Sequence, residues 1–400
     1  MRCAVRGLPV NELQALLKRA GASNIRVAPR TGQVFCNLPM AAIESLRARG
    51  LTVKPLGRLQ TQQYEAYGPI TGTNAALAAF LDQAREVLTP PVLGEMWKVA
   101  VLDTGIRDSH IMLKGKVVHE KNFTGSPTAT DVFDHGTAVA GLIAGGRPTP
   151  GEEQGVAPAA QLLNIKVLGD DGTGEEEDVV MGVEEAIEQG AKIINMSFGT
   201  EDTGDPDSPV RVACRAAYDE GILVGAAAGN TGPDPGTIMS PACDETVWAV
   251  GALEPSGYVA DFSARGPTKE GLVKPEVMFY GDRLLLCSAT SDDAFITKSG
   301  TSFACAGISG STALLQEGAV RVFGRELTQE ENWMMTMLIT RKPREAPQPP
   351  NKDNDYGWGM PFGDLAARMA SPMGGMVDMV APVLTIGMMG AVMKGMVPVS

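Results

Sequence analysis

The hydrophobic pattern of the chain changes near residue 97. From there on, short apolar runs alternate with stretches in which apolar residues recur at helical spacing. Apolar runs without polar alternation are typical of strands buried on both faces, as in a parallel sheet covered by helices. We therefore predict an α/β fold with a central parallel sheet, with strands at residues 99–102, 162–167, 193–196, 223–227 and 247–250 and helices that include 179–188 and 210–220.

The first 58 residues show a different order of elements. Residues 11–20 place Leu13, Leu16 and Leu17 on one helical face, and residues 41–49 predict a second helix. Short strands are expected on either side of these helices, with a turn at residues 29–32. The resulting order βαββαβ is that of a ferredoxin-like α+β domain, with its strands at residues 3–6, 25–28, 33–38 and 51–56.

Two further segments complete the predicted organisation. Residues 59–75 are polar and rich in Gly and Thr, which indicates an exposed linker, and residues 75–87 predict a helix that leads into the large domain. The tail is rich in Met and Gly, and its uncharged stretch, residues 379–393, is shorter than the ~20 residues of a membrane-spanning helix. We expect the tail to pack on the body or on a partner, with membrane association as the alternative. The predicted boundaries are 1–58, 59–90, 91–368 and 369–400.

Composition narrows the class of protein. The formal net charge of −13 over 400 residues argues against a nucleic-acid partner. Six cysteines occur without metal-site spacing, mostly in apolar runs, and buried free thiols are expected. The first residues lack the apolar core of a secretory signal, which favours a cytoplasmic or other intracellular location over secretion.

The candidate chemistry centres on Ser302, which stands at the predicted mouth of a small-residue helix. A helix N-terminus carries unpaired N–H groups and suits developing negative charge. A serine nucleophile also needs a base, usually a histidine oriented by a carboxylate. His135 precedes a similar small-residue helix, and Asp103 follows a buried strand at its carboxyl end, where α/β sites lie. Asp103, His135 and Ser302 are therefore the predicted catalytic residues.

The motifs around these residues resemble those of the subtilisin-like serine proteases, in the order of that family. The three motifs are Asp103-Thr104-Gly105, His135-Gly136-Thr137 and Gly300-Thr301-Ser302-Phe303-Ala304, and the resemblance covers about residues 95–367. It implies a three-layer subtilisin-like domain that hydrolyses peptide bonds through an acyl-enzyme. It also implies that the ferredoxin-like domain is a prodomain, which assists folding, inhibits the site as an intramolecular partner, and is released by self-cleavage within residues 59–75.

The resemblance also assigns roles to other residues of the predicted cleft. Asn230 matches the oxyanion asparagine of the family. Two short segments correspond to the strands that bind a polypeptide substrate by strand addition, and three residues correspond to the pocket for the side chain before the cut. A Met239 that points inward would make this pocket shallow and favour small or medium side chains. The predicted binding residues are Gly172, Thr173, Gly174, Ser197, Phe198, Gly199, Ala227, Gly229 and Met239.

The acidic run at residues 175–178 has two interpretations. One is a solvated helix start, because negative charge is favourable at a helix N-terminus. The other is a rim that selects substrates with basic residues upstream of the cut.

No cofactor is expected for the chemistry. Many relatives place a calcium-binding aspartate near the first catalytic residue, but the corresponding position holds Met112. The usual strong calcium site is therefore in doubt. A weaker structural calcium site remains possible at residues 170–178 or 202–207, since calcium takes six to eight oxygen ligands.

Two other functions compete with the protease hypothesis. A peptide ligase or macrocyclase would pass the same acyl-enzyme to an amine instead of water. A non-catalytic binding protein could retain the fold, although the complete set of Asp103, His135, Ser302 and Asn230 argues against it.

Overall fold

A computed structural model describes residues 1–61, 92–146, 155–342 and 352–361. The N-terminal domain has the predicted order of elements and forms a four-stranded antiparallel sheet, β2-β3-β1-β4. This order confirms the ferredoxin-like α+β fold. Its elements are β1 (Arg2–Arg6), α1 (Val10–Arg19), β2 (Ser23–Ala28), β3 (Gln33–Asn37), α2 (Met40–Ala48) and β4 (Thr52–Pro55).

The two faces of this small sheet bury different residues. Cys3 and Val5 of β1 face the helices and pack with Leu13 and Leu17 of α1. The residue between them, Ala4, belongs to a second hydrophobic cluster shared with the large domain. Because side chains alternate along a strand, one strand serves the domain's own core and the surface that docks on the large domain.

The large domain is built on a seven-stranded parallel sheet in the order β14-β13-β12-β10-β6-β8-β7. All five predicted strands are confirmed. The two edge strands, β7 and β14, were not predicted, and β7 alternates between exposed and partly buried residues. The strands are β6 (Lys98–Asp103), β7 (Val117–Asn122), β8 (Gln161–Lys166), β10 (Ile193–Met196), β12 (Leu223–Ala227), β13 (Trp248–Leu253) and β14 (Val277–Tyr280).

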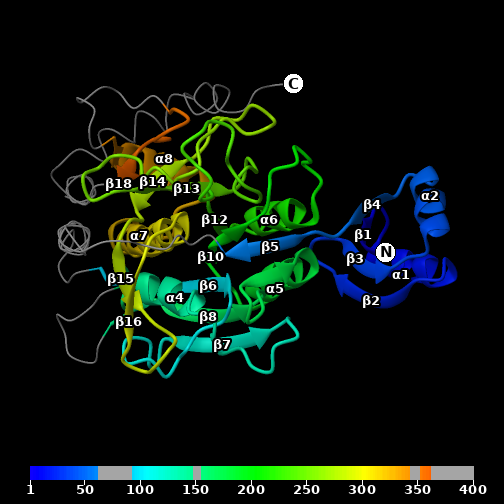
Figure 1. The fold of residues 1–400 in the computed structure, drawn as a ribbon, viewed down its shortest axis with the longest axis horizontal. Coiled ribbons are helices and arrows are strands. Elements are labelled where there is room, and N and C mark those ends of the chain that lie inside the picture. The colour runs from blue at the N-terminus through cyan, green and yellow to red at the C-terminus, as the bar shows by residue number, and fades with distance from the viewer. Residues whose placement is uncertain (62–91, 147–154, 343–351, 362–400) are drawn as a thin grey trace.

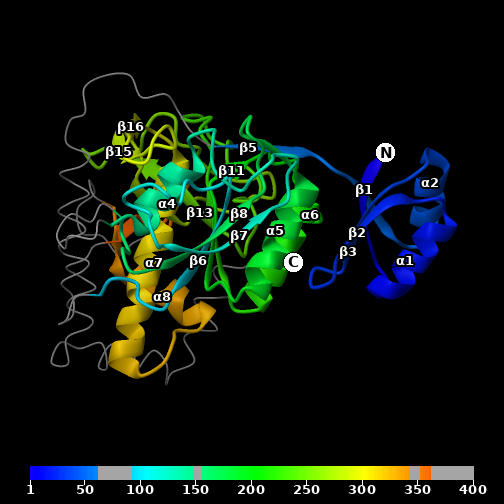
Figure 2. The same ribbon diagram turned by 90° about the horizontal axis from the view of Figure 1, so that it is seen from below.

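Helices cover both faces of this sheet, which confirms the three-layer α/β architecture. On one face, α4 (Gly136–Ala144), α7 (Thr301–Phe323) and α8 (Gln329–Ile339) pack over one hydrophobic cluster. On the other face, α5 (Glu176–Glu188) and α6 (Pro209–Asp219) pack over the second cluster, and they lie toward the N-terminal domain (Figure 2). The predicted catalytic motifs therefore stand at the ends of elements that are packed into the two hydrophobic clusters.

A third sheet joins the two domains. Its central strand, β5 (Arg58–Thr61), lies antiparallel between β9 (Thr173–Glu175) and β11 (Phe198–Gly199). Figure 1 shows β5 extending from the N-terminal domain into the large one. The prediction of an exposed linker at residues 59–75 is therefore wrong for residues 59–61. These residues pair with a strand on each side, and Leu59 is only 2% exposed.

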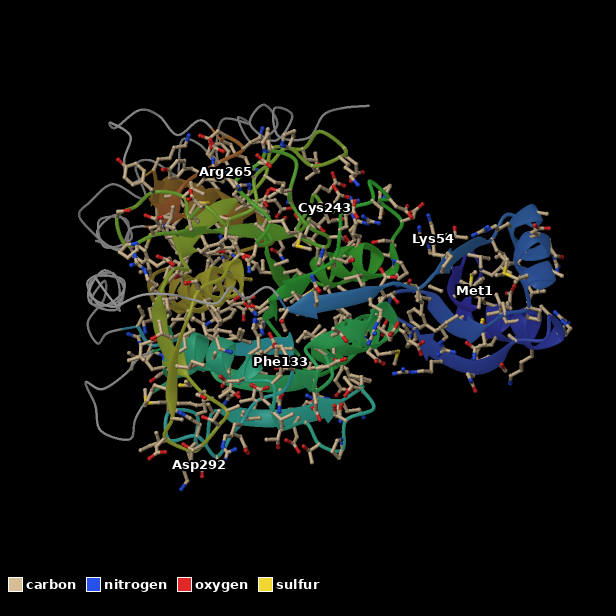
Figure 3. All side chains as sticks on the ribbon, in the orientation of Figure 1. Met1, Lys54, Phe133, Cys243, Arg265 and Asp292 are labelled. Carbon is tan, nitrogen blue, oxygen red and sulfur yellow. The ribbon has the colours of Figure 1, made fainter. Side chains whose placement is uncertain are left out.

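The N-terminal domain contacts a set of carboxylates that we call the docking face: Glu175, Glu176, Glu177, Asp178, Glu184, Asp205 and Asp207. Glu177 forms ion pairs with Arg2 at 2.5 Å and with Arg26 at 3.0 Å. Lys54 forms an ion pair with Asp205 at 2.5 Å. Lys54 lies at the junction of the two domains in Figure 3. The solvated helix start expected at residues 175–178 is wrong for Glu176 and Glu177, which are 8% and 4% exposed.

The remaining described elements form two small two-stranded antiparallel sheets. β15 (Leu284–Cys287) pairs with β16 (Phe295–Lys298), and β17 (Thr340–Arg341) pairs with β18 (Met360–Pro361). All six cysteines are buried and free, as expected. The predicted helix at 75–87 and the tail at 369–400 lie outside the described residues. Within the described ranges, the structure contains no helix that is both long and apolar enough to cross a membrane.

Candidate active site

Ser302 lies in the first turn of α7, as predicted, and is fully buried. Its Oγ donates a hydrogen bond to the carbonyl oxygen of Ser197 at 2.8 Å. The Ser197 hydroxyl donates in return to the carbonyl oxygen of Ser302, also at 2.8 Å. This reciprocal pair joins the start of α7 to the residue between β10 and β11, so the hydroxyl is held beside the strand that pairs with β5.

His135 directly precedes α4, and its imidazole is buried against Asp103. The distance from His135 Nδ1 to Asp103 Oδ1 is 2.7 Å. Because a carboxylate oxygen accepts, the proton of the neutral imidazole is assigned to Nδ1 and the lone pair to Nε2. Within the described residues, Nε2 is buried without a hydrogen-bond partner. This nitrogen is therefore available to accept a proton.

Asp103 is the last residue of β6 and is itself fully buried. The same Oδ1 that faces His135 also accepts the backbone N–H of Thr104 at 2.7 Å. A carboxylate that accepts two donors at one oxygen is held in one rotamer. The strand end thus fixes the direction from which Asp103 meets the imidazole.

Asn230 follows β12 and presents an amide to the same region. Its Oδ1 accepts two hydrogen bonds from Thr301, from the backbone N–H at 3.0 Å and from the hydroxyl at 2.8 Å. These contacts fix the amide orientation, so the NH₂ group points away from Thr301. In the part of the chain that the structure describes, Nδ2 is buried and has no acceptor. A buried, unpaired donor next to Ser302 is suited to an oxyanion that forms during reaction.

The predicted substrate-binding strands face each other across β5. Gln60 lies opposite both Thr173 of β9 and Gly199 of β11. The backbone N–H of Thr61 donates to the carbonyl oxygen of Gly172 at 3.1 Å. The structure therefore brings five of the six predicted strand residues alongside one extended segment, and it places the sixth, Ser197, at Ser302.

Met239 lies between Gly229 of the predicted pocket and Gly199 of a predicted substrate-binding strand. A Cβ at Gly229 would lie 2.6 Å from Cγ and 2.8 Å from Sδ of Met239, and one at Gly199 would lie 3.2 Å from its Cβ. Gly229 also has φ +119°, which favours glycine. Met239 is 9% exposed and points inward as the prediction required. Ala227 is fully buried in the cluster beneath α7.

Phe133 is a binding-site neighbour that the sequence analysis missed. A Cβ at Gly172 would lie 2.5 Å from Cζ of Phe133, so the ring covers Gly172. Figure 3 labels Phe133 in the central part of the molecule. One residue, Asp134, separates Phe133 from His135, and that spacing was the only available signal. Without the contact to Gly172, an aromatic residue there is indistinguishable from a core residue.

The carboxylates at the two candidate calcium positions are bound by other groups of the protein. Among the described residues, no group of three or more His, Cys, Asp and Glu is arranged to hold a metal ion. At residues 170–178, Asp170 pairs with Lys166 at 3.0 Å. At residues 202–207, Asp202 accepts the backbone N–H groups of Gly204 and Lys269. These carboxylates are thus engaged by protein donors.

Together, these contacts give a buried serine, a histidine paired with a carboxylate and two strands that flank one extended segment, which is the arrangement expected of a serine hydrolase. Comparison with known families assigns it further: the subtilase family model matches residues 94–359, so this chain belongs to the subtilase family. It is a subtilisin-like serine protease, a hydrolase acting on peptide bonds.

Individual relatives agree with this assignment. The major intracellular serine protease of Bacillus subtilis (strain 168) is 38% identical over 270 residues, which cover 65% of this chain and 80% of the relative. The intracellular serine protease of Paenibacillus polymyxa is 38% identical over 253 residues, covering 61% and 73%. The serine protease AprX of Bacillus subtilis (strain 168) is 35% identical over 273 residues, covering 60% of each chain.

Proposed function

We propose that Asp103, His135 and Ser302 form the catalytic triad of this endopeptidase. The observation that carries the proposal is the buried 2.7 Å hydrogen bond between His135 Nδ1 and Asp103 Oδ1, which leaves Nε2 as the acceptor. Ser302 Oγ attacks the peptide carbonyl carbon while its proton passes to Nε2. The imidazolium then protonates the leaving amine, and water hydrolyses the acyl-enzyme with His135 again acting as base. Asp103 stabilises the imidazolium throughout.

Asn230 is the proposed oxyanion donor. Its Nδ2 is buried, has no acceptor in the described residues, and is aimed by the two hydrogen bonds from Thr301. The first turn of α7 adds the partial positive charge of a helix N-terminus at the nucleophile. Donors fixed before the reaction stabilise the developing charge without reorganisation.

The proposed substrate is a polypeptide bound in extended form between β9 and β11, in the position that β5 takes. Met239 fills space between Gly199 and Gly229, which supports a preference for small or medium side chains before the cut. In Met239→Gly, kcat/KM for substrates with Phe or Tyr at this position should rise about 10-fold or more relative to Ala substrates. A wild-type peptide profile already dominated by Phe or Tyr would contradict this prediction.

We also propose that the enzyme is a self-processing proenzyme. The N-terminal domain supplies β5, which pairs on both sides as a substrate strand would. Cleavage within residues 59–75 would separate the domain covalently, and the domain would inhibit the enzyme while it stays docked. We also propose an intracellular location, like that named for two relatives, a weak structural calcium site, and docking of the C-terminal tail on the body or on a partner.

We also propose that the acidic run at residues 175–178 selects substrates with basic residues upstream of the cut. Arg58 of β5 pairs with Glu175 at 2.9 Å, in the strand position that an upstream substrate residue would take. Selective loss of cleavage of basic peptides in Glu175→Lys would support it. An equal loss across all peptides would contradict it.

The test is intact mass over time for the wild type and Ser302→Ala, together with hydrolysis of peptides. The wild type should lose an N-terminal piece that ends within residues 59–75 and should hydrolyse peptides, and Ser302→Ala should do neither. A wild type that forms new peptide bonds faster than it hydrolyses them would favour the ligase alternative. A wild type inactive even after release of the N-terminal domain would favour the binding-protein alternative.

A further inference from the structure

Asp131 is a buried carboxylate beside the proposed triad that plays no part in the chemistry above. It is 1% exposed and stands four residues before His135, in the segment that leads into α4. None of its described hydrogen bonds goes to the side chain of His135 or Asp103. Its partners belong instead to the segments that carry those two residues.

The first set of contacts brackets His135. Asp131 Oδ1 accepts the backbone N–H groups of Phe133 and Asp134, both at 3.0 Å. Its Oδ2 accepts the backbone N–H of Thr137 at 2.9 Å. One carboxylate therefore holds the backbone on both sides of His135, and the imidazole is presented from a loop with little freedom to shift.

The second contact reaches the segment that follows Asp103. The hydroxyl of Thr104 donates to Asp131 Oδ1 at 2.9 Å and accepts the backbone N–H of Gly136 at 3.0 Å. The backbone N–H of Thr104 donates to Asp103 Oδ1 at 2.7 Å. Thr104 thus connects Asp131 to Asp103 on one side and to the residue after His135 on the other.

Every partner donates to this carboxylate, so the network is complete only when Asp131 is ionised. The net effect of the surroundings is a raised pKa of Asp131: burial raises it most, the hydrogen bonds from Thr137 and Thr104 lower it, and the charge of Asp103 raises it again. A buried cation also contacts this network: Lys166 Nζ donates to the carbonyl oxygen of Thr104 and pairs with Asp170 at 3.0 Å. A buried charge kept in place by this many donors has a positional role.

We propose that Asp131 is a positioning residue that sets the 2.7 Å contact between His135 and Asp103, acting through Thr104 and the backbone of residues 133–137. This inference rests on the proposed triad. The network bonds directly to the segments that carry the proposed catalytic groups, and it reaches the substrate strands only through the ring of Phe133 over Gly172. Its loss therefore affects turnover more than substrate binding.

The test compares steady-state kinetics of Asp131→Asn with the wild type on one peptide substrate. Asparagine has nearly the shape of aspartate, but its amide NH₂ group would face one of the N–H or O–H groups that donate to Asp131. The expected result is a fall in kcat of about 10–100-fold with KM within about 2-fold. Asp292→Asn is the matched control, because Asp292 also binds this region, through Arg107 and Ser109, but from the exposed side, and its kcat should stay within about 2-fold.

A second pair of variants keeps the test decisive if Asp131→Asn fails to fold. Thr104→Val removes the bridging hydroxyl at nearly constant volume and should lower kcat about 10-fold, whereas Thr104→Ser restores the hydroxyl and most of the loss. Reduced thermal stability of Asp131→Asn or Thr104→Val with unchanged kcat would overturn the proposal. An inactive wild type would instead refute the proposed function, so the two failures are distinguishable.

Discussion

The active site and the docking face hold their parts by different physical means. At the active site, buried neutral donors and two carboxylates fix one another over distances of 2.7–3.0 Å, and the residues involved are shielded from solvent. At the docking face, most contacts join an arginine or lysine of the N-terminal domain to a carboxylate of the large domain. Arg2 and Arg26 are 28% and 36% exposed there.

This difference predicts how the structure of each region responds to salt. Hydrogen bonds in a buried network are little affected by salt, because mobile ions cannot approach them. Partly exposed ion pairs are screened and contribute about 0–1 kcal/mol each. The active site should therefore keep its geometry under conditions that loosen the N-terminal domain. This difference fits the proposal that the N-terminal domain inhibits the enzyme and is then released.

The largest expected effect is at the active site. In Asn230→Ala the proposed oxyanion donor is lost, and kcat should fall about 10²–10³-fold with little change in KM. Asn230→Asp is the matched variant, since it can keep the acceptor for Thr301 and lose only the donor. Steady-state kinetics on one peptide would check both. Full activity of Asn230→Asp would show that the amide N–H₂ does not stabilise the reaction.

A smaller effect is expected at the docking face. Glu177→Gln removes the shared partner of Arg2 and Arg26, and it should raise hydrogen exchange at the β5 backbone about 10-fold, or about 1.4 kcal/mol. The measurement uses the full chain carrying Ser302→Ala. Sodium chloride at about 1 M should act in the same direction. Hydrogen exchange at Phe133 and Thr137 should stay unchanged. An equal rise at these two residues would show that the active site and the docking face do not respond separately.

The smallest effect is expected at Glu176, which neighbours Glu177 but has no ion pair among the described contacts. Burial raises the pKa of Glu176, opposed by the hydrogen bond from the backbone N–H of Gly57 at 2.6 Å. A raised carboxyl pKa favours the docked state below the ordinary value near 4.5, and this advantage is lost as pH rises through the raised pKa. Glu176→Gln should therefore slow β5 exchange about 2–3-fold at pH 7 and have no effect near pH 4. Faster exchange at pH 7 would mean that the charge itself stabilises docking.

The sequence predicted the parts of the fold whose signal lies within a single element. The run at residues 99–102 is apolar throughout, so its burial in β6 followed from its own composition. In contrast, β5 reads Arg-Leu-Gln-Thr and gains its order from β9 and β11, more than 100 residues away. The edge strand β7 was missed for a related reason, since only one of its faces packs on the protein and Val118 is 49% exposed.

The residues of the candidate site also fall into those predictable from a local motif and those that depend on contacts made by folding. Asp103, His135, Ser302 and Asn230 each stand in a short motif, and the order of those motifs along the chain made them predictable. The positions of Phe133 over Gly172 and of Asp131 beside Thr104 depend on pairs of residues brought together by folding. One of the two interpretations of the acidic run at 175–178, the solvated helix start, is wrong for Glu176 and Glu177 because the N-terminal domain that covers them cannot be placed from sequence alone.

The most direct test of the central claim is covalent labelling of the nucleophile. Wild type, Ser302→Ala and His135→Ala would be treated with a fluorophosphonate, and the modified peptide would be identified by mass spectrometry. We predict one label on the wild type at Ser302, none on Ser302→Ala, and labelling of His135→Ala slowed at least 100-fold. A label at another residue, or equal labelling of wild type and His135→Ala, would contradict the proposed triad.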